Sequence, residues 1–133
     1  MGALIDSSIL VAAERGRLDL ESALAKHQDS QFAISAITAS ELLHGVHRAR
    51  GEARRGRRQA FVEGLLSSIP VISFDLVAAR AHARIWAKLA ARGVTVGAHD
   101  LLIAATAVSR GMDVVTHDTR SFPKVPGLKL VRW

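Results

Sequence analysis

Ala3-Leu4-Ile5-Asp6 is an apolar run that ends in a carboxylate, and Val114-Val115-Thr116-His117-Asp118 repeats this pattern near the other end of the chain. Short apolar runs without polar alternation are typical of strands buried on both faces of a parallel sheet. Parallel strands end at one edge of their sheet, where α/β folds form their ligand crevice. The two runs therefore predict an α/β domain with carboxylates gathered at one sheet edge.

Three further runs rich in β-branched residues complete this interpretation, and helical stretches fill the intervals between them. The predicted strands cover residues 3–6, 32–34, 71–73, 114–116 and 129–131. The predicted helices cover residues 8–16, 19–27, 35–50, 52–67, 75–92 and 100–110. We expect a single domain over residues 1–133, with a mainly parallel five-stranded sheet.

The composition narrows the class of protein. The chain has 133 residues, 49% of them hydrophobic, which is enough for one domain with its own core. It has no cysteine, so disulfides and thiolate metal sites are excluded. No basic leader precedes Asp6 and no apolar run approaches membrane-spanning length. We expect a soluble, cytoplasmic protein that does not bind a membrane.

The net charge of +6 is concentrated in one segment. Residues 48–58 carry six arginines and one glutamate, a local charge of +5. Such a patch suits a polyanion, most commonly nucleic acid, although a solvated turn between two helices would look the same. The candidate nucleic-acid-binding residues are Arg48, Arg50, Arg54, Arg55, Arg57 and Arg58.

Two more acids extend the pattern, but each acid also has a purely structural explanation. Glu41 follows an apolar stretch and Asp100 precedes one. Asp6 could cap a helix, Glu41 could complete a capping box that starts at Thr38, Asp100 could favour a helix macrodipole, and Asp118 could form an Asx turn.

Taken together, the four acids indicate a metal site. Carboxylates that converge raise one another's pKa values unless a cation is bound. Oxygen-only ligands favour Mg²⁺, with Mn²⁺ as a substitute. Glu41 and His44 also have the spacing of carboxylate-bridged di-iron sites, but the chain lacks the second such pair. His99 and His117 adjoin two of the acids, where they could orient ligands or simply lie on the surface.

Four motifs in this order resemble the PIN-domain ribonucleases, and more narrowly the VapC-type toxins of bacterial toxin-antitoxin pairs. The resemblance runs the full length of the chain through residues 4–8, 39–45, 99–107 and 114–122, followed by residues 125–128 and Trp133. It implies a three-layer α/β/α sandwich with sheet order 3-2-1-4-5. One departure is Ser121, which stands where members of the family often have an acid.

Carried over residue by residue, the resemblance implies a catalytic, metal-binding site of Asp6, Glu41, Asp100 and Asp118. Ser7 and Thr116 are expected to assist from around these ligands. The implied activity is an Mg²⁺-dependent endoribonuclease that uses metal-activated water, leaving 5′-phosphate and 3′-hydroxyl ends.

The resemblance also implies the partners. These are an RNA substrate, a cognate antitoxin that covers the acidic groove, often through an arginine or lysine, and a second copy of the chain in a homodimer. Two alternatives stay open: a catalytically silent PIN-fold domain that binds nucleic acid or acts as a scaffold, and a metal phosphohydrolase. The second has no G-x-x-x-x-G-K-[ST] loop to support it.

Overall fold

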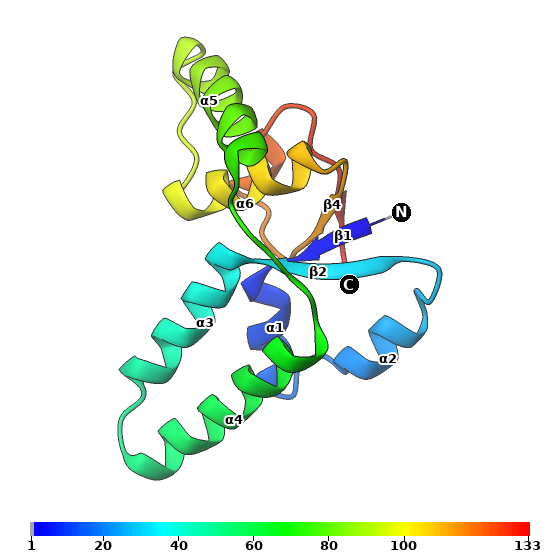
Figure 1. The fold of residues 1–133 in the computed structure, drawn as a ribbon, viewed down its shortest axis with the longest axis vertical. Coiled ribbons are helices and arrows are strands. Elements are labelled where there is room, and N and C mark those ends of the chain that lie inside the picture. Colours follow the sequence, from blue (N-terminus) through cyan, green and yellow to red (C-terminus); the bar gives the residue numbers. More distant parts are fainter. Residues whose placement is uncertain (1) are drawn as a thin grey trace.

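The computed structural model describes residues 2–133 and contains a single five-stranded sheet (Figure 1). Its strands are β1 Gly2–Ile5, β2 Gln31–Ser35, β3 Val71–Ile72, β4 Asp113–Val115 and β5 Leu130–Val131. They lie in the order β3-β2-β1-β4-β5, and every pair is parallel. The predicted strands and their order are confirmed.

The helices lie close to their predicted positions. They are α1 Ser7–Glu14, α2 Leu20–Ala25, α3 Ala36–Arg48, α4 Glu52–Ser68, α5 Leu76–Ala91 and α6 Ala98–Ser109. The main difference is α6, which begins two residues before Asp100 and so places this acid within its first turn. A short 3₁₀ helix, Phe122–Lys124, was not predicted from the sequence.

Successive residues of a strand point to opposite faces of the sheet. Apolar residues lie on both faces here, and a layer of helices covers each face. Leu4 and Val114 pack with residues of α5 and α6 on one face. Ile5 and Val115, the next residues along the same strands, pack with residues of α1, α3 and α4 on the other face. The chain therefore forms the expected three-layer sandwich (Figure 1).

Helices α3 and α4 form a hairpin that extends away from the sheet (Figure 1). Gly51 makes the turn with a φ of +86°, a conformation that residues with a Cβ rarely adopt. Arg55 donates a hydrogen bond to the carbonyl oxygen of Ala49 at 3.0 Å, which ties the start of α4 to the end of α3. The arginine-rich segment therefore lies at the tip of this hairpin.

Trp133 anchors the end of the chain beside β2. Its ring stacks on His27 at a centroid distance of 5.5 Å and meets Phe32 edge-on at 5.2 Å. The carbonyl oxygen of Trp133 also lies 2.9 Å from Nε2 of His117, in the loop that follows β4. Across residues 2–133, no helix has both the length and the apolar character needed to cross a membrane.

Leu4 offers a test of this packing, because it is fully buried in the central strand. We expect Leu4→Ala to lower the free energy of unfolding by about 2–5 kcal/mol, through lost burial and the cavity that remains. Leu76→Ala removes the same atoms from a side chain that is 66% exposed, and should change the free energy of unfolding by less than about 0.5 kcal/mol. Urea unfolding measures both values, and equal losses would contradict the assigned core.

Candidate active site

The site is built on the junction between β1 and β4. The two strands pair in parallel with Ile5 opposite Val115, so Asp6 and Thr116 leave the sheet at its carboxyl edge side by side. The backbone N–H of Asp6 donates to the carbonyl oxygen of Val115 at 2.9 Å, which extends the ladder by one bond. Asp6 is 5% exposed, so its carboxylate is held in the interior and not on the surface.

One oxygen of Asp6 is held by its surroundings. Its Oδ2 accepts hydrogen bonds from the Ser8 hydroxyl at 2.8 Å and the Thr116 hydroxyl at 2.9 Å. The backbone N–H of Ser8 also points to Oδ2, at 3.4 Å, so Asp6 is the N-cap of α1 as well. Within residues 2–133 no hydrogen bond reaches Oδ1, which leaves this oxygen for an external ligand.

The two hydroxyls are themselves fixed by the loop that follows β4. The N–H of His117 donates to the Ser8 hydroxyl oxygen at 3.1 Å, and the N–H of Asp118 donates to the Thr116 hydroxyl oxygen at 2.9 Å. Each hydroxyl is thereby directed toward Asp6. The network locks the position of the buried carboxylate from two segments more than 100 residues apart in the sequence.

Ser7 was expected to assist the acids, but the residue that contacts Asp6 is Ser8. The Ser7 side chain makes no hydrogen bond within residues 2–133, whereas the Ser8 hydroxyl contacts both Asp6 and Thr116. The reason is helix geometry: an N-cap side chain reaches the second or third residue of the helix, and Ser8 is the second residue of α1. The sequence offered Asp6 as a helix cap, but only the structure shows that α1 begins at Ser7 and that Ser8 therefore contacts the carboxylate.

Glu41 lies on α3 with its side chain 29% exposed. Its Oε2 is 3.4 Å from Nδ1 of His99, whereas its Oε1 is buried and has no hydrogen-bond partner in residues 2–133. Burial raises the pKa of Glu41; the hydrogen bond from His99 opposes this effect, and the charges of Asp6 and Asp100 add to it. A buried carboxylate oxygen without a partner is costly unless a ligand supplies one.

The capping-box interpretation of Glu41 is wrong. The N-cap of α3 is Ser35, whose hydroxyl oxygen accepts a hydrogen bond from the N–H of Thr38 at 3.0 Å. Helix α3 therefore begins at Ala36, before the expected capping box starts, and Glu41 lies in its second turn. The side chain of Glu41 is free to face the other acids.

Asp100 reaches the same edge from the first turn of α6. Burial raises its pKa; the hydroxyl of Ser121 lowers it, and the charges of Asp6 and Asp118 raise it further. Gly97 makes room for this carboxylate, because a Cβ at that position would lie 3.3 Å from Oδ2 of Asp100. Ser121, which departs from the family pattern, thus faces the site as a hydroxyl.

Asp118 forms the Asx-type turn that the sequence left open. Its Oδ1 accepts from the N–H of Arg120, and its Oδ2 accepts from the N–H groups of Ser121 and Phe122, at 3.0–3.1 Å. Burial raises the pKa of Asp118, but these three backbone donors outweigh it, so the pKa lies below its usual value. Both oxygens of this acid are already engaged, whereas Glu41 keeps one oxygen, Oε1, without a partner.

The charges of Asp6 and Asp100 raise the pKa of Glu41, and those of Asp6 and Asp118 raise the pKa of Asp100, so the four acids lie close enough to form one site. As the side chains stand, no group of three or more His, Asp or Glu residues in 2–133 is arranged to hold a metal ion. Repulsion between unscreened carboxylates keeps their oxygens apart while no cation is bound. The donor set nevertheless fits a hard cation, since it consists of oxygens and includes the unpartnered Oε1 of Glu41. His44 is exposed and belongs to no such group.

Two members of the arginine segment have structural contacts. Arg55 bonds to Ala49, as described above, and Arg58 donates to the carbonyl oxygen of Gly45 at 3.2 Å and pairs with Glu14 at 3.5 Å. The remaining four, Arg48, Arg50, Arg54 and Arg57, are exposed and make no ion pair within residues 2–133.

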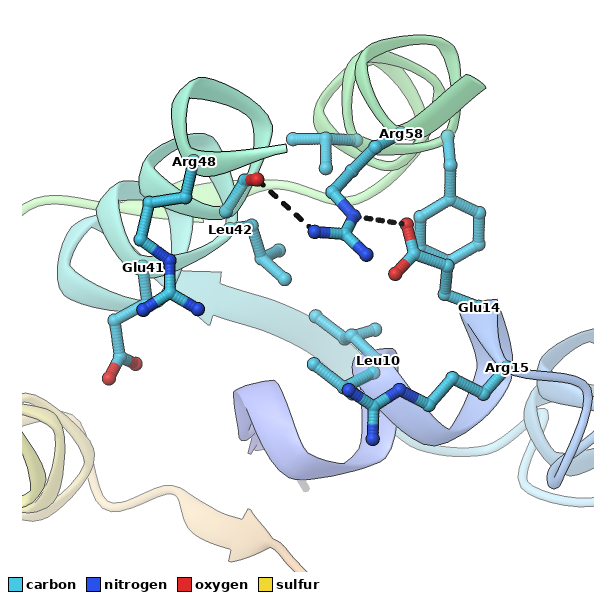
Figure 2. A pocket seen from close by; sticks show the side chains of 11 residues that line it. Leu10, Glu14, Arg15, Glu41, Leu42, Arg48 and Arg58 are labelled. Carbon is cyan, nitrogen blue, oxygen red and sulfur yellow. Dashed lines mark hydrogen bonds and ion pairs between the residues drawn. The ribbon is translucent and has the colours of Figure 1, made fainter. Parts of the chain in front are cut away.

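A cavity of about 170 Å³ joins this hairpin to the acidic site (Figure 2). It lies between α1, α3 and α4, with an apolar lining that includes Leu10, Leu42 and Phe61. Figure 2 shows Glu41 and Arg48 on one side of the cavity, with Glu14 and Arg58 across it. The cavity therefore combines apolar walls, cations and one acid of the site.

The raised pKa of Glu41 predicts how stability depends on pH in the absence of metal. A group with a raised pKa favours the folded state when it is protonated. For Glu41 this contribution to stability is fully present below the pKa of the unfolded state and is lost as pH rises through the raised pKa of the folded state. We therefore expect Glu41→Gln to raise the Tm in chelator by a few degrees at neutral pH, and by less at mildly acidic pH.

Asp118→Asn provides the contrast, because the lowered pKa of Asp118 stabilises the folded protein at neutral pH and is lost only in acid. This variant should lower the Tm at neutral pH. Thermal unfolding over a pH series measures both effects. A lower Tm for Glu41→Gln at neutral pH would show that the carboxylate is not destabilised by burial.

The chain is similar to known proteins over most of its length. Residues 3–128 match the family model of the PIN domain. The chain is 35% identical to Ribonuclease VapC of Rickettsia bellii, covering 98% of this chain and 96% of that protein. It is 38% identical to the tRNA(fMet)-specific endonuclease VapC of Salmonella typhimurium, over 78% of this chain and 76% of that protein.

Solved structures show the same relationship. The crystal structure of DNA-bound VapBC from Salmonella typhimurium superposes with a TM-score of 0.90 at 30% identity, covering 100% of this chain and 98% of that chain. VapBC2 from Rickettsia felis, bound to a promoter DNA fragment, superposes with a TM-score of 0.87 at 27% identity, covering 100% and 99%. The chain therefore belongs to the PIN-domain family, among the VapC proteins.

Proposed function

We propose that this protein is an Mg²⁺-dependent endoribonuclease and the toxin of a toxin-antitoxin pair, with Mn²⁺ as a substitute metal. The observation that carries the proposal is the buried, unpartnered Oε1 of Glu41 beside Asp6 and Asp100. A divalent cation would provide the missing partner and remove the repulsion between the carboxylates. The names of the VapC relatives support the assignment to ribonucleases.

Each residue of the site has a distinct role in this proposal. Asp6, Glu41 and Asp100 hold the cation, which when bound supplies an activated water and charge stabilisation at the phosphodiester. Ser8 and Thr116 keep Asp6 oriented through its Oδ2. Asp118 shapes the loop that presents Ser121 and adds negative charge beside Asp100. Attack by water on the phosphorus, with the 3′ oxygen as the leaving group, would leave 5′-phosphate and 3′-hydroxyl ends.

Asp6→Asn tests the activity. Loss of a metal ligand should reduce cleavage of total RNA by more than the roughly 10- to 100-fold typical of residues that only orient a ligand. Gel analysis of total RNA with Mg²⁺, Mn²⁺ or chelator measures this loss. Asp19→Asn is the matched control, because Asp19 also caps a helix through its carboxylate but lies outside the site. It should retain full activity.

Metal binding can be followed without any cleavage. Mg²⁺ at a hundred times its dissociation constant should stabilise the wild type by about 2.7 kcal/mol, and the resulting rise in Tm should be absent from Asp6→Asn. Cleavage that persists in chelator, or products that end in a cyclic phosphate, would sink the proposed chemistry. A metal-induced rise in Tm without cleavage of any RNA would favour the catalytically silent alternative.

We propose that the cavity in Figure 2 receives a segment of the antitoxin. Solved structures that match the chain at 27–30% identity are VapBC assemblies, and the cavity joins apolar walls to the acidic site. An apolar side chain of the antitoxin would fill the cavity, and a basic side chain beside it would reach Glu41. We propose that the complex contains a homodimer of this chain.

Gly45 lines the cavity and allows a direct test. Gly45→Leu should fill part of the space and weaken antitoxin binding at least about tenfold, the equivalent of 1.4 kcal/mol. Gly45→Ala is the matched control: its Cβ would meet only Arg58, at 3.8 Å, and alanine favours the helix by about 1 kcal/mol. Calorimetric titration with the antitoxin measures both. Unchanged affinity for Gly45→Leu would place the antitoxin elsewhere.

We propose that the exposed arginines of the hairpin tip, Arg48, Arg50, Arg54 and Arg57, hold phosphates of the RNA. Their guanidinium groups are free of internal ion pairs within residues 2–133, which suits phosphate recognition. Arg55 and Arg58 contribute mainly by bracing the hairpin that carries the others.

A further inference from the structure

Helix α5 carries a second row of cations that the proposed site does not use. Arg80, Arg84, Lys88 and Arg92 follow one another at intervals of four residues, the last directly after the helix, and all four are exposed. This interval places them on successive turns, about 6 Å apart along the helix axis and each turned by about 40° from the one before, so that the row winds slowly over the exposed surface. The row is therefore a continuous line of positive charge.

This row has no acidic counterpart within the described part of the chain. None of the four cations forms an ion pair in residues 2–133, and α5 itself contains no acidic residue. The nearest acid in sequence is Asp75, whose carboxylate caps the helix through the N–H of Ala78 and pairs with Arg110 at 3.2 Å. Solvated helix faces usually alternate the two signs of charge. A row of one sign indicates an anionic partner.

The same helix exposes the aromatic residue Trp86, whose accessible fraction is 60%. Its ring lies 5.5 Å from His82, which in turn lies 5.9 Å from Phe74. Helical periodicity puts Trp86 on one flank of the exposed surface and the cationic row on the other, with Ala83 and Ala87 between them. The alanines leave the space between the two flanks low and open.

This combination decides the class of partner. Surfaces that bind single-stranded nucleic acid join a positive track for the phosphates to aromatic rings on which bases stack. An acidic protein would match the cations but would leave no specific role for the exposed ring. A second copy of α5 would bring two rows of like charge together. The observations favour a single-stranded RNA.

The position of α5 agrees with this partner. Helices α5 and α6 pack together on one face of the sheet, while the α3–α4 hairpin lies on the other face (Figure 1). The acids lie at the carboxyl edge between these two layers, and Asp100 is in the first turn of α6, directly after the segment 92–97 that leaves α5. A strand bound along α5 therefore lies on the opposite side of the acids from the arginine tip.

We propose that α5 binds a single-stranded segment of the RNA substrate, with Arg80, Arg84, Lys88 and Arg92 on the phosphates and Trp86 under a base. The proposal rests on the proposed ribonuclease function, because it assigns a second contact surface to the same substrate. It gives the chain two basic surfaces, one on each side of the acidic edge, between which the RNA is held.

The test measures binding separately from cleavage. In an Asp6→Asn background, a variant with all four cations of the row changed to Gln is titrated with single-stranded RNA at several salt concentrations. The slope of log affinity against log salt should fall by between about 2 and 3, since each phosphate contact in a single strand contributes about 0.7. The matched control changes four exposed cations elsewhere, Arg17, Lys26, Lys124 and Lys129, to Gln. It has the same net charge and should keep the slope.

Trp86 provides an independent readout. With Trp133→Phe, Trp86 is the only tryptophan of the chain, and its fluorescence should be quenched when single-stranded RNA binds. Trp86→Ala should weaken RNA binding by about tenfold or more, in line with the loss of one stacked base. Sedimentation of the same variant reports whether Trp86 instead joins two copies.

Three results would overturn the proposal. The first is a salt slope that changes equally in the four-residue variant and in its control. The second is that Trp86→Ala converts a dimer to a monomer while RNA affinity is unchanged. The third is that the four-residue variant loses antitoxin binding while its salt slope is unchanged. Cleavage of total RNA by the same variants with Asp6 restored is scored separately. Retained cleavage with an unchanged slope would leave the ribonuclease function in place and remove only the role of α5.

Discussion

The carboxylate of Asp6 is the constraint on which this structure depends. A negative charge that is almost fully buried is costly unless it is hydrogen-bonded, and the fold supplies donors from both neighbouring segments. Ser8 is a local donor from the first turn of α1, whereas the Thr116 donor is in place only when β1 and β4 lie side by side in their parallel register. Correct pairing of the central strands and preparation of the acidic site are therefore a single event.

The remaining acids are placed by elements on both faces of the sheet, which gives the site its electrostatic character. Glu41 arrives on α3 from one layer and Asp100 on α6 from the other, so the two helical layers meet at the carboxyl edge. Burial raises the pKa of both groups, whereas backbone donors lower that of Asp118. The negative charges of Glu41 and Asp100 are thus destabilised by their surroundings, whereas that of Asp118 is stabilised by hydrogen bonds.

The sequence predicted the elements and the shared edge well, because buried strands and helix ends leave clear local signals. It could not separate Ser7 from Ser8, since the choice depends on which residue is the N-cap of α1. The capping-box alternative for Glu41 failed for a similar reason, because α3 begins at Ala36. The internal contacts of Arg58 were also beyond reach, as they join α4 to two other helices through tertiary packing.

The turn made by Asp118 has a consequence for genetics. Its carboxylate binds the N–H of Phe122, a core residue that is 1% exposed, so the same side chain serves the site and the packing beneath it. Escape mutants that survive expression of an active protein of this kind would include changes at Asp118 that act through misfolding. Soluble yield, and not survival alone, would distinguish these alleles from changes at Glu41, whose buried oxygen supports nothing else in the described chain.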